Sequence, residues 1–279
     1  MTDRIIQEVR RAHPSRDGDG VAIQRIAGMQ HAAMDPILML DELRAERRED
    51  LGGGFPPHPH RGMQTLTYMK RGGIIHEDSR GNRGEIRGGG VQWMSAGRGI
   101  VHSEMPTRDT EGLHGFQLWI NLPAAEKMSE PRYRDIPGSQ LAASRGDGYE
   151  AVAIGGEWQL GGETLVGPLH EIAPRAGVLD LHLEPESTIT LRLPASESLL
   201  AYIYEGTLRH AGQALGERHL LITSQGEQWS VQSGAGGASL LLLRGEPLRE
   251  PVAQYGPFVM NTPAEIELAI KDYQSGQFG

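Results

Sequence analysis

Two short pairs of residues are the strongest candidates for chemistry in this sequence: His58 with His60, and His102 with Glu104. In a β-strand, residues two apart point to the same face, so each pair directs two metal-binding side chains to one side of a sheet. If the two strands are neighbours, three imidazoles and one carboxylate converge on a single point. Nitrogen and oxygen donors of this kind suit Fe, Mn, Ni, Cu or Zn, and an octahedral metal would keep about two open positions.

The segments next to these pairs indicate how the strands would position them. Residues 52–57 are Gly-Gly-Gly-Phe-Pro-Pro, a turn-forming sequence that leads into the first pair. Pro59 cannot donate to a strand ladder, which predicts an edge position or the start of a strand. A second glycine-containing turn, residues 96–99, precedes His102. Between them, residues 65–69 alternate and carry β-formers, as a strand does.

The composition favours a β-rich chain with two cores. At 279 residues the chain is at the upper limit for one core, and 38 glycines and 17 prolines favour short strands joined by tight turns. Strand-like runs separated by turns recur about every ten residues, which predicts an all-β architecture of barrels or sandwiches. These runs include 21–23, 37–40, 118–122, 178–183, 188–193, 199–204, 219–223 and 240–243.

Charge and the absence of special segments narrow the function classes. The net charge of −9 argues against nucleic-acid binding through bulk electrostatics. The absence of cysteine removes disulfides, thiolate ligands and a cysteine nucleophile. No apolar run reaches signal-peptide or membrane-spanning length, so we expect a cytoplasmic protein with no membrane partner.

Three further segments have predicted structures. Residues 41–50 are dense in charge and are expected to be exposed, and the polar stretch 126–139 is expected to be a linker. Thr262-Pro263-Ala264-Glu265 is a capping box, which predicts a helix that ends near Ser275. We therefore expect domains at residues 1–135 and 136–279, the second ending in this helix.

A weak internal repeat supports two related domains. Tyr68, Gly72 and His76 are echoed at an offset of 134 residues by Tyr202, Gly206 and His210. The offset maps His58 and His60 near Arg192 and Pro194. Each copy is followed by a glycine turn, Gly97 or Gly226, and these turns map His102 and Glu104 near Val231 and Ser233. None of the four mapped residues is a histidine or a carboxylate. The second domain is therefore predicted to lack a metal site.

These motifs resemble the cupin superfamily, in which a glycine-rich approach precedes a His-x-His pair and a second turn precedes a third histidine. The common cupin pattern has a glutamate about four residues after His-x-His, where this chain has Gln64 and Thr65. A variant with the carboxylate at Glu104 is similar to the pirin family. The similarity is carried by long blocks at 57–62, 76–78, 91–106, 118–123, 245–248 and 255–262.

The resemblance implies two tandem cupin β-barrels, with iron in the first held by His58, His60, His102 and Glu104. It also implies a metal-free second barrel. Members of the family are described as quercetin 2,3-dioxygenases and as regulators that bind partner proteins in a metal-dependent way. His76 and His114 are interpreted as structural or outer residues rather than ligands, with Glu77, Asp78 and Gln64 as candidate partners of the ligands.

The preferred hypothesis is an Fe(II)-dependent dioxygenase that cleaves a flavonol-like substrate with O₂, with Glu104 as ligand and proton acceptor. One alternative is a non-enzymatic iron-binding protein that docks a protein partner according to its metal state. Another is a cupin isomerase or hydrolase that uses a different divalent metal, Mn, Ni, Cu or Zn. Arg61 and Arg98, which neighbour the ligands, could attract an anionic substrate or could be ordinary loop charges.

Overall fold

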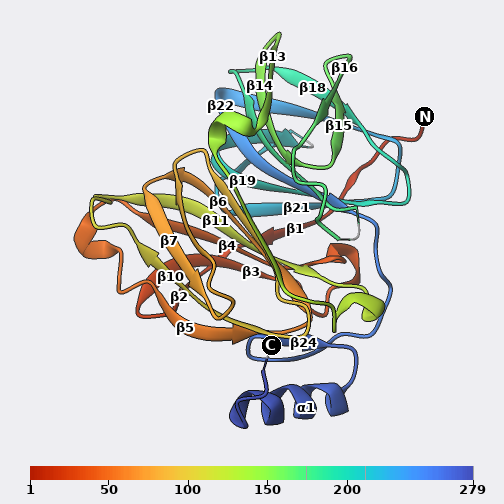
Figure 1. The fold of residues 1–279 in the computed structure, drawn as a ribbon. Coiled ribbons are helices and arrows are strands. Elements are labelled where there is room, and N and C mark those ends of the chain that lie inside the picture. The colour runs from red at the N-terminus through yellow and green to blue at the C-terminus, as the bar shows by residue number, and fades with distance from the viewer. Residues whose placement is uncertain (174, 211, 279) are drawn as a thin grey trace. The chain divides into compact units, whose positions relative to one another are not determined.

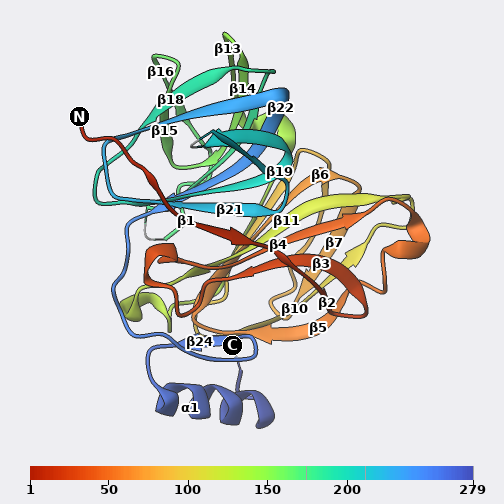
Figure 2. The ribbon, with the colours of Figure 1, turned by 180° about the vertical axis from the view of Figure 1, so that it is seen from behind.

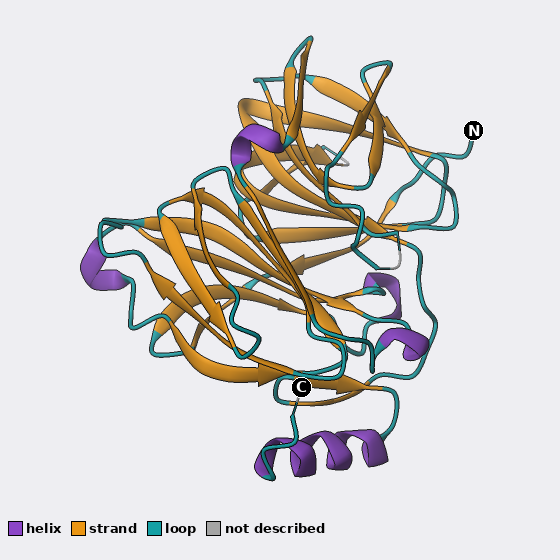
Figure 3. Cartoon of the chain, in the orientation of Figure 1, coloured by secondary structure: helices purple, strands orange, loops and turns teal. Residues whose placement is uncertain are grey.

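The fold is known from a computed structural model, which describes residues 1–173, 175–210 and 212–278 (Figure 1). Strands make up most of the described chain (Figure 3), and α1 (Pro263–Gln274) is the one α-helix among the described residues. This confirms the predicted all-β class with a C-terminal helix. Within the described residues, no helix has the length and apolar character needed to cross a membrane.

Contacts divide the chain into two compact units that interleave in sequence. We call His13–Gln30, Ile37–Gln140 and the chain from Leu248 onward the N-terminal barrel. The C-terminal barrel comprises Met1–Ala12, His31–Pro36 and Leu141–Pro247. The linear division into 1–135 and 136–279 stays a proposal for the domain organisation.

The N-terminal barrel contains a seven-stranded and a four-stranded antiparallel sheet. The first has the order β12 (Arg132–Ile136), β9 (Val91–Ser95), β6 (Met63–Arg71), β11 (Leu113–Asn121), β4 (Ile37–Ala45), β3 (Val21–Ala27), β2 (His13–Asp17). The second has the order β5 (Phe55–His60), β10 (Ile100–Pro106), β7 (Gly73–Asp78), β8 (Arg83–Arg87). The unit also contains the hairpin β23 (Ala253–Tyr255) and β24 (Phe258–Met260), and the short helices η2 (Arg48–Asp50), η3 (Ala124–Glu126) and η4 (Gly138–Gln140). β5 is an edge strand, as Pro59 predicts.

The two sheets of this barrel pack face to face through apolar side chains. One buried cluster joins Val21, Leu43 and Met69 of the larger sheet to Ile74 and Ile86 of the smaller. Alternation along each strand places these side chains on the inner faces. Figure 2 shows β2, β3 and β4 of the larger sheet running side by side. The smaller sheet is thereby held with one face toward the barrel interior, and this face carries the candidate ligands.

Two sequence-based expectations about this barrel are wrong. Asp41 and Glu42 are buried rather than exposed, because β4 continues through them to Ala45. Arg25 on the adjacent β3 offsets the charge of Asp41 through two hydrogen bonds of 2.8 and 2.6 Å, so the carboxylate is paired where it is buried. The segment 126–139 is not only a linker, since β12 lies in it and pairs with β9.

The C-terminal barrel is formed by one branched eleven-stranded sheet. Its strands are β1 (Ile6–Arg11), β13 (Ala142–Gly146), β14 (Tyr149–Gly155), β15 (Glu157–Leu160), β16 (Glu163–Val166), β17 (Gly177–Leu183), β18 (Thr188–Arg192), β19 (Ser198–His210), β20 (Gln213–Gly216), β21 (His219–Thr223) and β22 (Gln228–Gly245), with the short helix η1 (Ala32–Met34). Its core is a large buried apolar cluster that includes Trp158, Leu181 and Leu240. β18 and β22, which carry three of the positions mapped by the repeat, pair with each other as β5 and β10 do.

The C-terminal helix forms as its sequence predicts. Thr262 caps it, with the side chain accepting from the Glu265 backbone N–H and Glu265 bonding back to the backbone of Thr262. Ile266 and Ala269 are buried in a cluster with Phe258 of β24. The helix therefore secures the C-terminal hairpin of the N-terminal barrel.

Candidate metal centre

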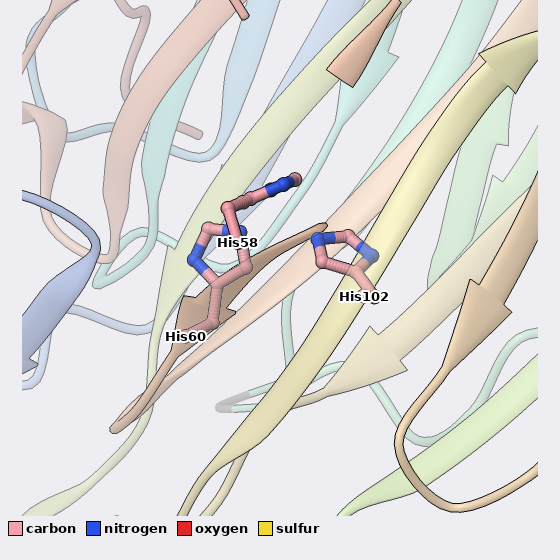
Figure 4. A group of neighbouring side chains, drawn as sticks. All are labelled: His58, His60 and His102. Atoms are coloured by element: carbon pink, nitrogen blue, oxygen red, sulfur yellow. The ribbon is translucent and has the colours of Figure 1, made fainter. Parts of the chain in front are cut away.

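The three predicted histidine ligands lie together on the inner face of the smaller sheet. His58 and His60 come from β5 and His102 from β10, and strand pairing places His102 opposite His58. One ring nitrogen from each lies within 4.8 Å of the other two (Figure 4). In the part of the chain that the structure describes, they form the one group of three or more side chains placed to hold a metal ion.

Each of these imidazole rings has a hydrogen-bond contact at one nitrogen, which leaves the other nitrogen for a metal ion. His58 donates from Nδ1 to the Pro56 carbonyl oxygen at 2.8 Å, and His60 has a backbone hydrogen bond with Pro257. The Nδ1 of His102 lies 3.2 Å from a ring nitrogen of His76. His60 Nδ1 and His102 Nε2 are buried and have no hydrogen-bond partner. Buried nitrogens without partners are costly, so the donor set fits a metal ion that these lone pairs would bind.

Burial also sets the protonation state that a metal requires. It lowers the pKa of His60 to about 3, with a further contribution from the neighbouring His58. Burial likewise lowers the pKa of His102 well below its usual range, helped by His60, His58 and His76. Both imidazoles are therefore neutral near pH 7 in the metal-free protein, which is the form that coordinates metals.

Glu104 lies beside this cluster but outside the three-histidine group. It is buried on β10, on the same strand face as His102. Its carboxylate accepts a hydrogen bond from the Thr67 hydroxyl at 2.9 Å and from the Gln117 amide at 3.2 Å. A carboxylate can accept about four hydrogen bonds, so these two leave capacity for a further interaction. Its roles as fourth ligand and proton acceptor stay predictions.

A cavity of about 700 Å³ opens next to the cluster, bordered by His58, His60 and Glu104. This volume is in the range of small-molecule sites. Much of its wall is apolar or aromatic, formed by Met29, Met39, Leu43, Phe55, Pro56, Pro57, Trp119 and Pro257. The charged residues of the wall are Asp17, Asp19, Arg25, Asp41 and Glu104.

Arg25, Asp17 and Asp41 are cavity residues that the sequence analysis did not identify. Arg25 bonds Asp41 and also Asp17, the latter at 2.5 Å. Burial raises the pKa of Asp41, although the Arg25 guanidinium opposes the shift. The sequence offers only a weak signal: an arginine two residues after one strand-like run and, sixteen residues later, an aspartate directly after the next run.

The C-terminal segment forms part of the cavity wall next to β5. Pro257 lines the cavity, and the Val259 N–H donates to the Arg61 carbonyl at 3.0 Å. Gly62 follows with φ +78°, and a Cβ there would lie 2.0 Å from the Val259 carbonyl oxygen. Only glycine permits this close passage at a positive φ.

The structure also places the other residues that the sequence singled out. His76 contacts His102, and Asp78 contacts His76 at 3.4 Å. His114 instead bonds Glu42 at 2.9 Å. Glu77 is paired with Arg83 on the exposed face.

Gln64, Arg61 and Arg98 do not border the cavity. Gln64 is fully buried, and Arg61 is buried against Asp272 of the C-terminal helix at 2.8 Å. Arg98 pairs with Glu130. Of the two alternatives for these arginines, a role in attracting a substrate is the less favoured, because both are already paired with carboxylates.

Comparison with known proteins gives matches over both barrels. The family described as Pirin matches residues 20–120, and the Pirin C-terminal cupin domain matches residues 178–279. The predicted pair of cupin domains is thereby confirmed, together with the resemblance on which it depended.

Individual relatives match nearly the whole chain. A Vibrio cholerae protein named "Putative quercetin 2,3-dioxygenase" is 46% identical over 99% of this chain and 98% of its own. Pirin-1 of Arabidopsis thaliana is 38% identical over 99% of this chain and 95% of its own. A crystal structure of quercetin 2,3-dioxygenase from Acinetobacter baumannii superposes with a TM-score of 0.89 at 30% identity, covering 99% of this chain and 98% of that one. On these matches, the chain belongs to the pirin family.

Proposed function

We propose that this protein is an Fe(II)-dependent dioxygenase of the quercetin 2,3-dioxygenase type, which cleaves a flavonol-like substrate with O₂. The observation that carries the proposal is the group of three histidines, with one ring nitrogen of each within 4.8 Å of the others, of which His58 and His60 border a cavity of about 700 Å³. Two similar proteins, from Vibrio cholerae and Acinetobacter baumannii, bear the name of this activity. In the proposal, His58, His60, His102 and Glu104 hold the metal.

The cavity wall favours an uncharged aromatic substrate. Phe55 and Trp119 offer ring surfaces on which a planar molecule can pack. Four carboxylates and one guanidinium border the space, and that guanidinium is already bonded to Asp17 and Asp41. A substrate bearing carboxylate or phosphate would meet like charges here, whereas a neutral polyphenol would not.

The protein groups would then orient the substrate and move one proton. Thr67 and Gln117 hold the Glu104 carboxylate at the cavity, where it can accept the proton of a substrate hydroxyl. The apolar wall excludes water from the reacting atoms. Bound iron would supply open coordination positions and a positive charge that lowers the pKa of an adjacent hydroxyl.

An alternative function is metal-dependent docking of a protein partner. It is favoured by the C-terminal barrel, whose described residues include no candidate metal group although the barrel spans a large part of the chain. In this alternative the metal controls binding rather than oxidation.

The test measures O₂ uptake with quercetin by protein reconstituted anaerobically with Fe(II). Wild type is compared with His58→Ala, which removes a half-buried ligand, and with His13→Ala, a matched change at an exposed histidine. We expect iron-dependent uptake that falls at least about 100-fold in His58→Ala, because loss of even a group that orients a metal ligand typically costs about 10- to 100-fold in metal affinity or activity. His13→Ala should match wild type.

Two outcomes would contradict the proposal. Absence of uptake by fully iron-loaded wild type would exclude the flavonol dioxygenase and favour the docking alternative. Undiminished uptake by His58→Ala would place the chemistry away from the histidine group.

A further inference from the structure

A third strand adds two buried polar residues to the face that carries the histidine group. His76 and Asp78 lie two apart on β7, which pairs with β10 on the side away from β5. The register places Asp78 opposite His102 and His76 opposite Glu104. Both side chains are fully buried. They therefore share the inner face with the proposed ligands.

His102 and His76 approach each other through the same ring atom, Nδ1. The two Nδ1 atoms are 3.2 Å apart, a hydrogen-bond distance that requires one of them to carry a proton and the other to be bare. His76 also stacks on Tyr133, with ring centroids 4.5 Å apart, which holds the plane of its ring. The position of the proton on this pair decides whether Nε2 of His102, the nitrogen without a hydrogen-bond partner, has a lone pair for a metal ion.

Asp78 determines which of the two Nδ1 atoms carries the proton. The Nε2 of His76 lies 3.4 Å from Asp78 Oδ2. The same carboxylate accepts from the Arg80 N–H at 2.9 Å, the Asn82 N–H at 3.0 Å and the Asn82 amide at 2.8 Å. An ionised carboxylate only accepts hydrogen bonds, so the favoured arrangement puts the proton of His76 on Nε2. The bare Nδ1 of His76 then accepts the Nδ1 proton of His102, and the Nε2 of His102 keeps its lone pair.

We propose that His76 and Asp78 are positioning residues that hold His102 in the tautomer able to bind a metal through Nε2. The inference rests on the metal site of the proposed function and is independent of the reaction that occurs there. Residues that fix the tautomer of a ligating histidine typically contribute about 10- to 100-fold to metal affinity. Because both side chains are buried, the Asp78 carboxylate rather than bulk water sets the position of the proton on His76.

Three variants separate the tautomer effect from a loss of packing. In Asp78→Asn, the remaining carbonyl oxygen takes the place of Oδ1 and accepts the backbone N–H groups of Arg80 and Asn82. The new amide takes the place of Oδ2 and donates to His76, and the Asn82 side-chain amide turns its oxygen toward it. This reverses the proton order and places a proton on His102 Nε2. His76→Leu removes the acceptor, whereas His76→Asn restores an oxygen near the position of Nδ1. Glu77→Gln, on the opposite exposed face of the same strand, is the matched control.

Two measurements on the chain of 279 residues test the inference. The ¹⁵N NMR spectrum of the metal-free protein identifies which ring nitrogen of His102 carries the proton. Competition titration with Zn²⁺, a redox-inert probe, gives the metal dissociation constant. We expect Nδ1–H for wild type and Nε2–H for Asp78→Asn. Zn²⁺ affinity should fall about 10- to 100-fold in Asp78→Asn and His76→Leu, recover largely in His76→Asn, and be unchanged in Glu77→Gln.

The outcomes distinguish this inference from the proposed function. If wild type binds Zn²⁺ and Asp78→Asn keeps both the wild-type tautomer and affinity, the positioning role is excluded while the metal site stands. If His76→Leu and His76→Asn weaken Zn²⁺ binding equally, the effect is one of packing and the inference fails. If folded wild type does not bind Zn²⁺ at this histidine group, both the metal site and the inference fail.

Discussion

Glu104 differs from the three histidines because both of its carboxylate oxygens already have hydrogen-bond donors. Thr67 and Gln117 come from β6 and β11 of the larger sheet, whereas Glu104 is on the smaller one. These bonds hold the side chain at the cavity. A group placed in this way can serve the proposed reaction as a proton acceptor, as a ligand, or as both.

The variant Glu104→Gln separates these roles. The amide keeps the size of the side chain and one acceptor oxygen but cannot take a proton at neutral pH, so we expect the oxygenase rate to fall about 10²- to 10⁴-fold. Iron content is measured on the same samples: retained iron with a lost rate assigns the proton-acceptor role, and lost iron assigns ligation. Glu111→Gln, at an exposed position, is the control. Full rate and full iron content in Glu104→Gln would show that neither role is correct.

At the scale of elements, the position of β5, which carries His58 and His60, depends on the C-terminal hairpin of β23 and β24. Lys127 lies between them and is almost completely buried. Its Nζ donates to the Gly62 carbonyl at 2.7 Å, the Asn121 side chain at 2.6 Å and the Val259 carbonyl at 3.0 Å. Burial lowers the pKa of Lys127 to about 8, which the more distant Glu250 and Glu265 partly oppose. One side chain thus joins the turn after His60 to β24.

Replacing Lys127 with methionine leaves those three buried acceptors without their donor. We expect Lys127→Met to lower the free energy of unfolding by at least about 3 kcal/mol, because each of the three unsatisfied buried acceptors costs about 1–3 kcal/mol. Lys271→Met, at an exposed position on α1, should change it by less than about 0.5 kcal/mol. Urea denaturation of the metal-free proteins provides the comparison. Equal urea midpoints for the two variants would show that the Lys127 bonds do not stabilise the fold.

At the scale of the whole molecule, the two barrels have different interiors. The N-terminal barrel has a cavity beside its histidine group, whereas the buried core of the C-terminal barrel is an apolar cluster and its pocket of about 770 Å³ is lined by other residues. At the positions that the internal repeat maps to ligands, the second barrel has residues such as Arg192 and Val231. The candidate metal site therefore lies in one barrel, and the other has an apolar core.

This difference predicts a stoichiometry of one metal ion per chain. Titration of metal-free protein with Zn²⁺ should end at one equivalent, and the double variant His58→Ala/His60→Ala should lose that binding because two of three histidine donors are gone. His182→Ala, an exposed change in the C-terminal barrel, should keep one equivalent. A second tight equivalent that persists in the double variant would reveal another metal site.

Several features of the protein are readable from local sequence alone. The two-residue spacing of His58 and His60 places both on one face of a strand, and Pro59 favours the edge that β5 occupies. The C-terminal capping box is likewise local, since its reciprocal bonds join residues three apart. Spacing also indicates that His76 and Asp78 share a face, although it does not identify which ligand they contact.

The tertiary structure decided the features that depend on distant partners. Asp41 belongs to a charge-rich segment, yet it is buried because Arg25 on the neighbouring strand meets it. Because β5 pairs with β10 and β10 pairs with β7, His102 lies next to both His58 and His76. Pro257, almost 200 residues from His60, anchors that ring. Pleating and capping act over a few residues and can be read from sequence, whereas strand pairing and charge burial depend on which segments the folded chain brings together.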